Sequence, residues 1–533
     1  MLILLVLAPL LVSRDSVASG GALLHGSVRD AATGMRVVGA VVTATGAGSS
    51  GVQTDGSGNY AMRLAGGTYT VTAFLTGYLP SSSTVTLSSS RETLNFTLHP
   101  VPSPPPPSKG ALQQNSTMVS PTGVIADGTL VLTVPNLPKP PSLSPVRPTP
   151  FGTKVTRIVG DPGTPIPFAQ GGAGTWSADA RHHYMSDEPW NADQTLIAID
   201  QPGGSPDLLF LDGSTYQPKM PRCPNYNRRD DRWHPSLPSV RINADGTLLE
   251  WFDVVQCRQL KAWTLPIPIS YLGLTNGNVS ADGWLVALGD RSGHMFLVDM
   301  RGNRFGPVAS YAYNGWTATG LGVSPSGQYV WVHYSGDYNR IFDVSPTTLA
   351  LTPHPERGPV CHGSAADGFV YDLGHQDVGQ NPFDNDEDVM VGQEHCGHVG
   401  STVSGQLLGH VVMVRLRDGA ITSLTNPTNE AYAYHISMRA VNRPGWAYVS
   451  YFENQNGMRF NQELISVKLD GSKTVERWAH QHTDTTNCYR CEAHPAPSWD
   501  GLRVIFASTW SLNCGIGCGT QLIRQDYVVD GRP

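Results

Sequence analysis

The sequence is poor in charged residues and has no hydrophobic run long enough to cross a membrane. Charged residues make up 15% of its 533 positions and the formal net charge is −7, so no nucleic-acid surface is expected. The apolar run from Leu2 to Val12 is far shorter than the roughly 20 residues that span a bilayer. The chain also has no Gly-x-Ser-x-Gly elbow, no phosphate-binding loop and no His-x-x-Glu pair. These absences exclude common serine-hydrolase, nucleotide-binding and metallocarboxypeptidase sites.

The same short apolar run fits the core of a signal peptide. Small residues in "SVASGG" provide a cleavage site near Ser19, although the usual basic residues ahead of the run are missing. We therefore expect residues 1–19 to be removed and the mature protein to be secreted and extracellular. In a eukaryotic secretory pathway, three sequons would accept glycans: Asn95, Asn115 and Asn278.

Eight cysteines, an even number, agree with export and disulfide formation. Cys223 with Cys257, and Cys361 with Cys396, are plausible pairs because about one repeat separates each pair. The last four cysteines form a C-x2-C and a C-x3-C set, for which we expect two disulfides, and a zinc ribbon is the alternative. Their connectivity stays open, and they are Cys488, Cys491, Cys514 and Cys518.

Turn-forming residues are abundant, with 57 glycines and 41 prolines between short β-branched and aromatic segments. This balance predicts an all-β protein. We divide it into a small β-sandwich over residues 20–100, a proline-rich linker over 101–150 and a seven-bladed β-propeller over 151–533. Proline at the density of "PVPSPPPPSKG" gives an extended spacer with no packed core of its own.

Short alternating runs such as "VVGAVVTAT", "YAMRL" and "TYTVTAF" predict about seven strands in residues 24–99. The order G-x-V-x-D, G-A-x-V, T-D-x-x-G-x-Y and G-x-Y-x-V resembles the carboxypeptidase regulatory-like domain. That resemblance implies a prealbumin-type sandwich with a carbohydrate-binding-like fold, in which Tyr60 packs inside. It says little about function, because such modules are usually accessory.

A turn followed by a strand recurs in the rest of the chain at intervals of about 40 to 60 residues. Seven units of this kind predict a propeller with four-stranded blades, and two packed sandwiches are the alternative. The last unit is one strand short, and we expect "GTKVTRIVG" at 152–160 to supply the missing strand. The units are "NADQTLIAID", "NADGTLLEWF", "SADGWLVALG", "SPSGQYVWVH", "DNDEDVMVGQ", "NRPGWAYVSY" and "SWDGLRVIFA".

Histidines recur in register with the later units. His375, His435 and His494 are about 60 residues apart, and each precedes the turn of its unit. Since equivalent loops of a propeller converge on its axis, we expect the three imidazoles to meet and to bind a divalent metal. In the alternative, each histidine only hydrogen-bonds a neighbouring blade. Three polar residues are available as a further ligand or as hydrogen-bond partners of the ligands: Gln376, Asp377 and Glu492.

The segments that carry these histidines resemble secreted propellers related to the oligogalacturonate lyases. The resemblance covers about 151–530 and rests on "RHHYMSDEPWNADQTLI", "GHQDVG", "YHISMRAVNRPGWAYVSYF", "NQELISVKLDGS" and "EAHPAPSWDGLRVIFASTW". It implies a seven-bladed propeller, manganese held by histidines and a glutamine, and β-elimination on uronate-containing oligosaccharides. The metal ligands that it implies are His375, His435, His494 and Gln376.

β-Elimination also needs a group that neutralises the uronate carboxylate and a base that removes the adjacent proton. Arg439 is the candidate for the first role, and His183 or Tyr184 for the second. In the alternative, Arg439 is an inter-blade salt-bridge partner and the other two residues are packing residues.

We therefore expect a secreted, monomeric protein whose partner is an acidic polysaccharide or oligosaccharide, without nucleic acid. The leading hypothesis is a metal-assisted polysaccharide lyase. The rivals are a non-catalytic propeller that binds carbohydrate or matrix, and a protein-interaction scaffold that uses the propeller rim.

Overall fold

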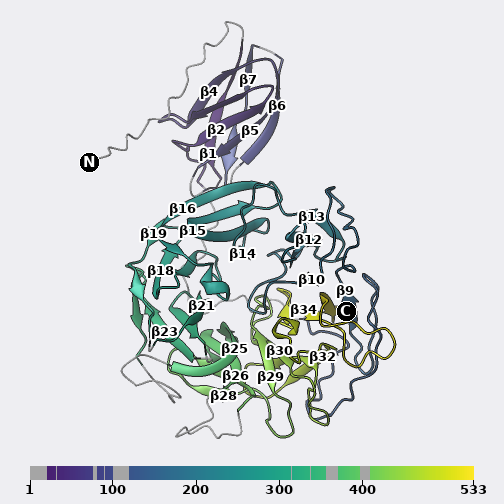
Figure 1. Ribbon diagram of the computed structural model, residues 1–533. Helices are drawn as coiled ribbons and strands as arrows, with labels where there is room; N and C mark the ends of the chain where they lie inside the picture. Colours follow the sequence, from purple (N-terminus) through teal and green to yellow (C-terminus); the bar gives the residue numbers. More distant parts are fainter. Residues whose placement is uncertain are drawn as a thin grey trace, which may run out of the picture. The chain divides into compact units, whose positions relative to one another are not determined.

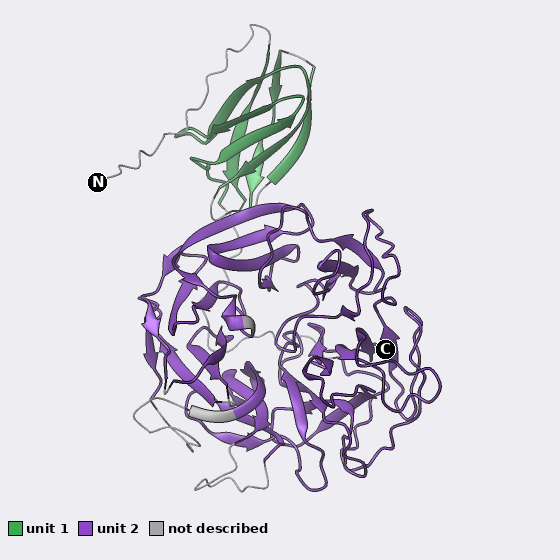
Figure 2. Cartoon of the chain, in the orientation of Figure 1, with its two compact units in different colours: residues 1–107 green, residues 108–533 purple. Residues whose placement is uncertain are grey.

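The computed structural model describes residues 21–31, 33–75, 78, 81–88, 90–99, 119–313, 315–335, 338–355, 370–395 and 408–533. The chain forms two compact units, Met1–Pro107 and Ser108–Pro533 (Figure 2). The regular elements in these ranges are β-strands and short 3-10 turns, so the all-β prediction is confirmed. Within the same ranges, no helix is long and apolar enough to span a membrane. The 3-10 turns are η1 (Gly273–Thr275), η3 (Pro382–Asp384) and η5 (Tyr489–Cys491).

The first unit is a sandwich of two sheets. One sheet has the order β4-β1-β7 with β8 beside β1, and the other has the order β3-β2-β5-β6. The strands are β1 (Ala22–Asp30), β2 (Val41–Gly46), β3 (Ser49–Gln53), β4 (Asn59–Leu64), β5 (Gly67–Phe74), β6 (Ser81–Leu87), β7 (Arg91–Thr93) and β8 (Phe96–Leu98).

Alternation of apolar and polar residues explains the sandwich. In β4, Tyr60, Met62 and Leu64 are buried while the residues between them are exposed. Val42 of β2 and Val71 of β5, in the other sheet, belong to the same core cluster as these β4 residues, so the two sheets share one core.

The second unit consists of small, mainly antiparallel sheets. Their strand orders are β11-β12-β13, β14-β15-β16, β17-β18-β19 with β20 beside β18, and β29-β30-β31-β32. An eight-stranded sheet joins β21–β24 to β25–β28 through the pair β23 and β25, and a last sheet has the order β10-β35-β34-β33 with β9 beside β35.

The strands of the first part of this unit are β9 (Lys154–Arg157), β10 (Asp179–Ala180), β11 (Leu196–Asp200), β12 (Leu208–Asp212), β13 (Pro218–Pro221), β14 (Asp231–Trp233), β15 (Val240–Asp253), β16 (Arg258–Ile269), β17 (Leu285–Gly289), β18 (His294–Asp299), β19 (Arg304–Phe305) and β20 (Ala309–Ser310). Those of the second part are β21 (Ala318–Val323), β22 (Tyr329–Tyr334), β23 (Tyr338–Val344), β24 (Leu351–Pro353), β25 (Val370–Asn381), β26 (Glu387–Glu394), β27 (Val411–Arg415), β28 (Ile421–Ser423), β29 (Ala433–Ser437), β30 (Trp446–Tyr451), β31 (Glu463–Lys468), β32 (Val475–His480), β33 (Ala496–Pro497), β34 (Arg503–Ser508) and β35 (Arg524–Asp530).

These sheets follow one another around a common centre in chain order, a propeller-like arrangement (Figure 1). Each sheet packs on the next through a shared core. Leu297 of β18 lies in one cluster with Val332 of β22, and Val389 of β26 in another with Val449 of β30. Successive sheets therefore hold each other by burial of apolar side chains between them.

The beginning and the end of the second unit share one sheet. Strand β9 pairs antiparallel with β35, with Val155 opposite Val529. The sequence prediction that 152–160 supplies a strand to the last unit is confirmed by this pairing. Strands β10 and β33 belong to this same sheet, and residues just after β10 lie beside residues just before β33.

The described part of the segment predicted as a linker packs on the second unit. Ile125 forms a bridge with Arg477 of β32, and the carbonyl of Leu137 accepts a hydrogen bond from the indole of Trp510. Its proline content prevents a core of its own, yet its carbonyl groups remain available as acceptors. Contact within the chain therefore divides it at Pro107 rather than at residue 150.

Three disulfides lie in the described residues: Cys223–Cys257, Cys488–Cys491 and Cys514–Cys518. The first is the predicted pair. The other two agree with the disulfide interpretation of the last four cysteines rather than with a zinc ribbon. The expected pair of Cys361 with Cys396 lies outside the described residues.

Candidate functional site

Three histidines from successive sheets come together. His375 lies in β25, His435 in β29, and His494 two residues before β33. The ring centroids of His375 and His435 are 4.3 Å apart, and those of His435 and His494 are also 4.3 Å apart. The sequence spacing thus located a real cluster, while the metal-ligand role of its members stays a prediction.

Irregular backbone directs these side chains. The pairing of β25 with β26 shifts register across His375, and the pairing of β29 with β30 shifts register across His435. Such bulges break the alternation of a strand and re-aim side chains, often beside functional sites. His375 and His494 also have positive φ values of 48° and 44°. This left-handed region is uncommon for residues other than glycine and is often used at functional sites.

His435, Glu492 and His494 form a group that can hold a cation. One ligand atom from each lies within 4.8 Å of the other two, and all three residues are buried. The Nδ1 atom of His435 is buried with no hydrogen-bond partner among the described residues. A bound ion or water would explain such an unsatisfied polar atom. Two imidazole nitrogens and one carboxylate oxygen suit a divalent transition metal. The residues present therefore fit a divalent ion.

Tyr434 fixes the carboxylate of this group. Its hydroxyl donates to Oε1 of Glu492 at 2.9 Å, and its ring stacks on Phe452 with centroids 3.9 Å apart. The other carboxylate oxygen, Oε2, lies 3.3 Å from Nε2 of His494. His375 contacts the same tyrosine ring, with centroids 4.8 Å apart, so one tyrosine joins a predicted ligand to the His–Glu group.

Both ring nitrogens of His494 have neighbours. Nη1 of Arg181 lies 2.9 Å from Nδ1, and Glu492 faces Nε2. A guanidinium can only donate, so Nδ1 accepts and the proton of the neutral ring sits on Nε2. For His494 to hold a cation through Nε2, that proton would have to move to Nδ1, and Arg181 could then no longer donate to Nδ1.

Burial sets the protonation of this group. Burial lowers the pKa of His435 and of His494 well below the usual value, so both rings stay neutral near neutral pH. Burial raises the pKa of Glu492 to about 7, against the opposing effects of Tyr434 and Arg181. Near neutral pH, one proton on Glu492 therefore competes with a cation.

The two candidate bases lie in different surroundings. The ring of Tyr184 lies 4.7 Å from that of His494 and 5.6 Å from that of His435, measured between centroids. His183 instead hydrogen-bonds Oδ2 of Asp187 through Nδ1 at 2.6 Å. Burial lowers the pKa of His183, but Asp187 more than offsets this and the pKa is raised. Of the two residues, Tyr184 is the one with contacts to the cluster.

Gln376 and Arg439 are held by other partners. Nε2 of Gln376 donates to Oδ1 of Asn339 at 2.9 Å. Nε of Arg439 donates to Oδ2 of Asp377 at 2.8 Å, and Nη1 lies 3.3 Å from Glu188. Arg439 is buried, and two carboxylates already balance its charge, so the structure favours the salt-bridge interpretation of this residue over a substrate-binding fork.

Sequence reasoning missed the residues that support His494 from the other end of the chain. Arg181 donates to its ring, and Nε2 of His182 lies 2.6 Å from its carbonyl oxygen. Nδ1 of His182 lies 2.9 Å from Oδ1 of Asp526, which anchors this support in β35. The available signal was the motif "RHHY", in which only the second histidine and the tyrosine were assigned roles.

The comparison with known families agrees with the resemblance inferred for the first unit. Residues 24–99 match the family of the carboxypeptidase regulatory-like domain. No curated protein sequence matches the chain. A solved structure described as oligogalacturonate lyase in complex with manganese is 12% identical, covers 75% of this chain and 99% of its own, and gives a TM-score of 0.47.

A second similar structure is a chain of a mitotic checkpoint complex. It is 10% identical, covers 70% of this chain and 96% of its own, and gives a TM-score of 0.39. Likeness at this level carries no assignment of function for the second unit. The segment for which a family model matches is residues 24–99, which are similar to the carboxypeptidase regulatory-like domain.

Proposed function

We propose that the protein is a secreted, metal-assisted polysaccharide lyase that cleaves uronate-containing glycans by β-elimination. The observation that carries this proposal is the meeting of His375, His435 and His494, with Glu492 beside two of them. The metal that we propose is manganese, following the resemblance of the histidine-bearing segments to the lyase family. The disulfides support an oxidising, extracellular compartment.

We also propose that the second unit is a seven-bladed propeller. When the eight-stranded sheet is counted as its two four-stranded halves, the described strands fall into seven groups. The pairing of β9 with β35 supports closure of the ring by strands from both ends of the unit. In this arrangement the strands that carry or directly follow the three histidines, β25, β29 and β33, are the innermost strands of consecutive blades.

β-Elimination in a uronate removes the proton at C5 and expels the substituent at C4. The carboxylate next to C5 opposes loss of this proton until its own charge is neutralised. A divalent ion bound at His435, Glu492 and His494 would supply that neutralisation. The remaining tasks, orienting the sugar and accepting the proton, fall to side chains of the protein.

Tyr184 is the residue that we propose as the base. It is partly exposed, and its ring contacts the rings of His435 and His494. A tyrosine accepts a proton from carbon only where nearby positive charge stabilises its phenolate. Arg181 and Tyr184 both contact the ring of His494, so Arg181 provides such a charge near Tyr184.

The rival function is a carbohydrate- or matrix-binding propeller without catalysis. One observation favours it: both ring nitrogens of His494 already have protein partners, as expected of a structural histidine. The orphaned Nδ1 of His435 argues against it, because a purely structural role leaves that buried atom unsatisfied.

Metal content and product absorbance together test the proposal. The full chain, purified without chelators, should carry about one divalent metal per molecule by mass spectrometry. It should convert polygalacturonate or another uronate polymer into a product that absorbs in the ultraviolet because of its new double bond. Chelation should stop the reaction and manganese should restore it. Glycan binding without product by the metal-loaded protein would establish the binding propeller instead.

A further inference from the structure

Three arginines share one carboxylate beside the histidine cluster. Nε of Arg181 donates to Oδ1 of Asp179 at 2.9 Å. Arg490 donates to Oδ2 of Asp179 through Nη2 at 2.8 Å and through Nε at 3.1 Å. Nη1 of Arg524 lies 3.7 Å from the same oxygen. Asp179 lies in β10, far from Arg490 and Arg524 in the sequence.

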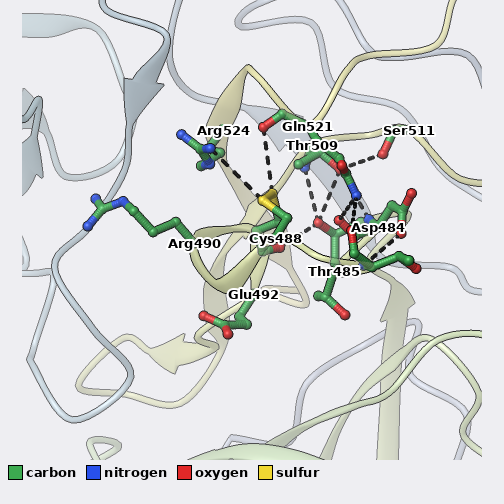
Figure 3. The surroundings of a disulfide bond; sticks show 12 residues. Asp484, Thr485, Cys488, Arg490, Glu492, Thr509, Ser511, Gln521 and Arg524 are labelled. Atoms are coloured by element: carbon green, nitrogen blue, oxygen red, sulfur yellow. Dashed lines mark hydrogen bonds between the residues drawn. A yellow bond between two sulfur atoms is a disulfide. The ribbon is translucent and has the colours of Figure 1, made fainter.

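This group is joined directly to the site. Arg181 contacts both Asp179 and the ring of His494. Arg490 belongs to η5, the turn that the Cys488–Cys491 disulfide closes, and Glu492 is the next residue after that turn. Figure 3 shows Arg490 and Glu492 extending from the turn, with Arg524 approaching the sulfur of Cys488, from which its Nη2 is 3.9 Å away.

One carboxylate serves three guanidinium groups. Among the described residues, Asp179 is the carboxylate that pairs with Arg181, Arg490 and Arg524. Glu492, which follows the turn, instead faces Tyr434 and His494. Arg439, by contrast, has two carboxylates for one guanidinium.

Donors also remain open in this group. A guanidinium carries five N–H donors. Arg490 uses only Nε and Nη2 toward the described residues, and its side chain is 50% exposed. The Nε atom of Arg524 is buried and has no hydrogen-bond partner in the part of the chain that the structure describes. Guanidinium groups with unused donors therefore lie next to a candidate catalytic site.

We infer that Arg181, Arg490 and Arg524 form an anion-recognition site that binds the carboxylate of a uronate next to the histidine cluster. The planar guanidinium matches a planar carboxylate through paired hydrogen bonds, which a lysine could not reproduce. The identity of the anion rests on the proposed function. The disulfide-closed turn holds Arg490 in place before the ligand arrives, which reduces the entropy lost on binding.

Calorimetric titration of the full-length protein with oligosaccharides tests this site. The probes are trigalacturonate, its fully methyl-esterified form and a sulfated galactose trimer. Titrations with chelator remove any metal contribution. We expect the acid form to bind at least about tenfold more tightly than the uncharged ester, with an affinity that falls as salt is raised. We also expect the sulfated trimer to bind more weakly than trigalacturonate.

Variants test whether these arginines are responsible for the binding. Arg490→Ala and Arg524→Ala should each weaken trigalacturonate binding about five- to tenfold while leaving binding of the ester unchanged. Arg490→Lys keeps the charge and should recover only part of the loss. The matched control is Arg304→Ala. Arg304 is 47% exposed and pairs with Asp299, 2.9 Å away, and both residues lie in a sheet other than that of Asp179. It should bind like the wild type.

The outcomes separate this inference from the proposed function. Selective binding of trigalacturonate without any elimination by the metal-loaded protein would overturn the lyase and leave the recognition site standing. Equal affinity for acid and ester, or wild-type affinity in both alanine variants, would overturn the recognition site even if elimination occurs. Tighter binding of the sulfated trimer would overturn the assignment to uronate.

Discussion

The imidazole rings of His435 and His494 lie 4.3 Å apart, centroid to centroid, although the two residues belong to different sheets. Each ring is buried, and burial depresses the pKa of each. Two neutral imidazoles held this close, with Glu492 beside them, could share a divalent ion. The first prediction tests this relationship directly.

Replacing His435 with alanine should abolish metal binding. The change removes one of three ligand atoms, and we expect the apparent dissociation constant to rise by about 100-fold or more, since loss of even a supporting residue costs 10- to 100-fold. Metal content after dialysis should fall from about one ion per chain to nearly none. His494→Ala should behave in the same way.

His294→Ala is the control for these variants. His294 begins β18, is 49% exposed in its side chain and pairs with Asp290, away from the cluster. Its metal content should equal that of the wild type. Unchanged metal content in both His435→Ala and His494→Ala would show that the cluster is structural.

Part of this picture was accessible from sequence. The repeat of turn and strand predicted the all-β second unit, the partnership of 152–160 with the last strands and the convergence of three histidines. These features depend on periodicity, which a single sequence displays. The bulges at His375 and His435 have no such periodic signal, so the directions of these two side chains could not be predicted from the sequence.

The features that the sequence does not reveal are ion pairs between residues far apart in the chain. Arg181 and Arg490 meet at Asp179, and Arg439 meets Asp377 and Glu188. Each pairing depends on which loops the arrangement of sheets brings together, and local sequence does not encode it. The short distance along the chain from His435 to Arg439 predicts a place near the histidines, but it does not reveal the two carboxylates that pair with Arg439.

Metal affinity should depend on pH through Glu492. Burial raises the pKa of this carboxyl to about 7, so it gains a proton as the pH falls through neutrality, and a protonated carboxyl is a poor ligand. The histidines stay neutral in this range because burial lowers their pKa. Affinity for Mn²⁺ should thus fall about tenfold per pH unit below 7 and level off above it.

Titration of Mn²⁺ between pH 5 and 8 checks this dependence. Glu492→Gln removes the titrating group, so its weaker affinity should vary little over the same range. A pH dependence equal to that of the wild type in Glu492→Gln would assign the proton to another group. Glu250→Gln, in β15, is the control and should titrate like the wild type.

Tyr184→Phe should lower kcat strongly without loss of metal. Removal of a general base typically costs roughly 100- to 10,000-fold in rate. The phenylalanine ring preserves the contacts of Tyr184 with His435 and His494, so the KM for a uronate oligomer and the metal content should change little. Steady-state kinetics with Tyr271→Phe as control measures the effect. If kcat falls in His183→Asn and not in Tyr184→Phe, the general base is His183.

Arg439 should contribute to stability rather than to substrate binding. Arg439→Met leaves the buried Asp377 and the largely covered Glu188 without their cation, and breaking a buried pair costs about 3–5 kcal/mol of unfolding free energy. Adding Asp377→Asn should recover part of that loss. For the exposed pair of Arg304 and Asp299, the equivalent change should cost under about 1 kcal/mol. Denaturant unfolding measures both.

Asp388 should make the second unit more stable in mild acid than in base. Burial raises its pKa to about 6, even though Ser324 and Ser326 donate hydrogen bonds to it. The folded state therefore binds a proton that the unfolded state releases near pH 4, and this stabilisation is lost as the pH rises through about 6.

Asp388→Asn removes the ionisable group and should raise the unfolding free energy at pH 8 by roughly 2–3 kcal/mol relative to the wild type, with the gain vanishing near pH 4. Asp418 provides a control of opposite sign, because hydrogen bonds from Arg415 lower its pKa. Its stabilisation is present above the unfolded pKa and is lost as the pH falls. Asp418→Asn should therefore destabilise at pH 8 and have little effect near pH 3. A gain for Asp388→Asn that stays constant across this range would show that Asp388 is ionised throughout and that the burial argument fails at this position.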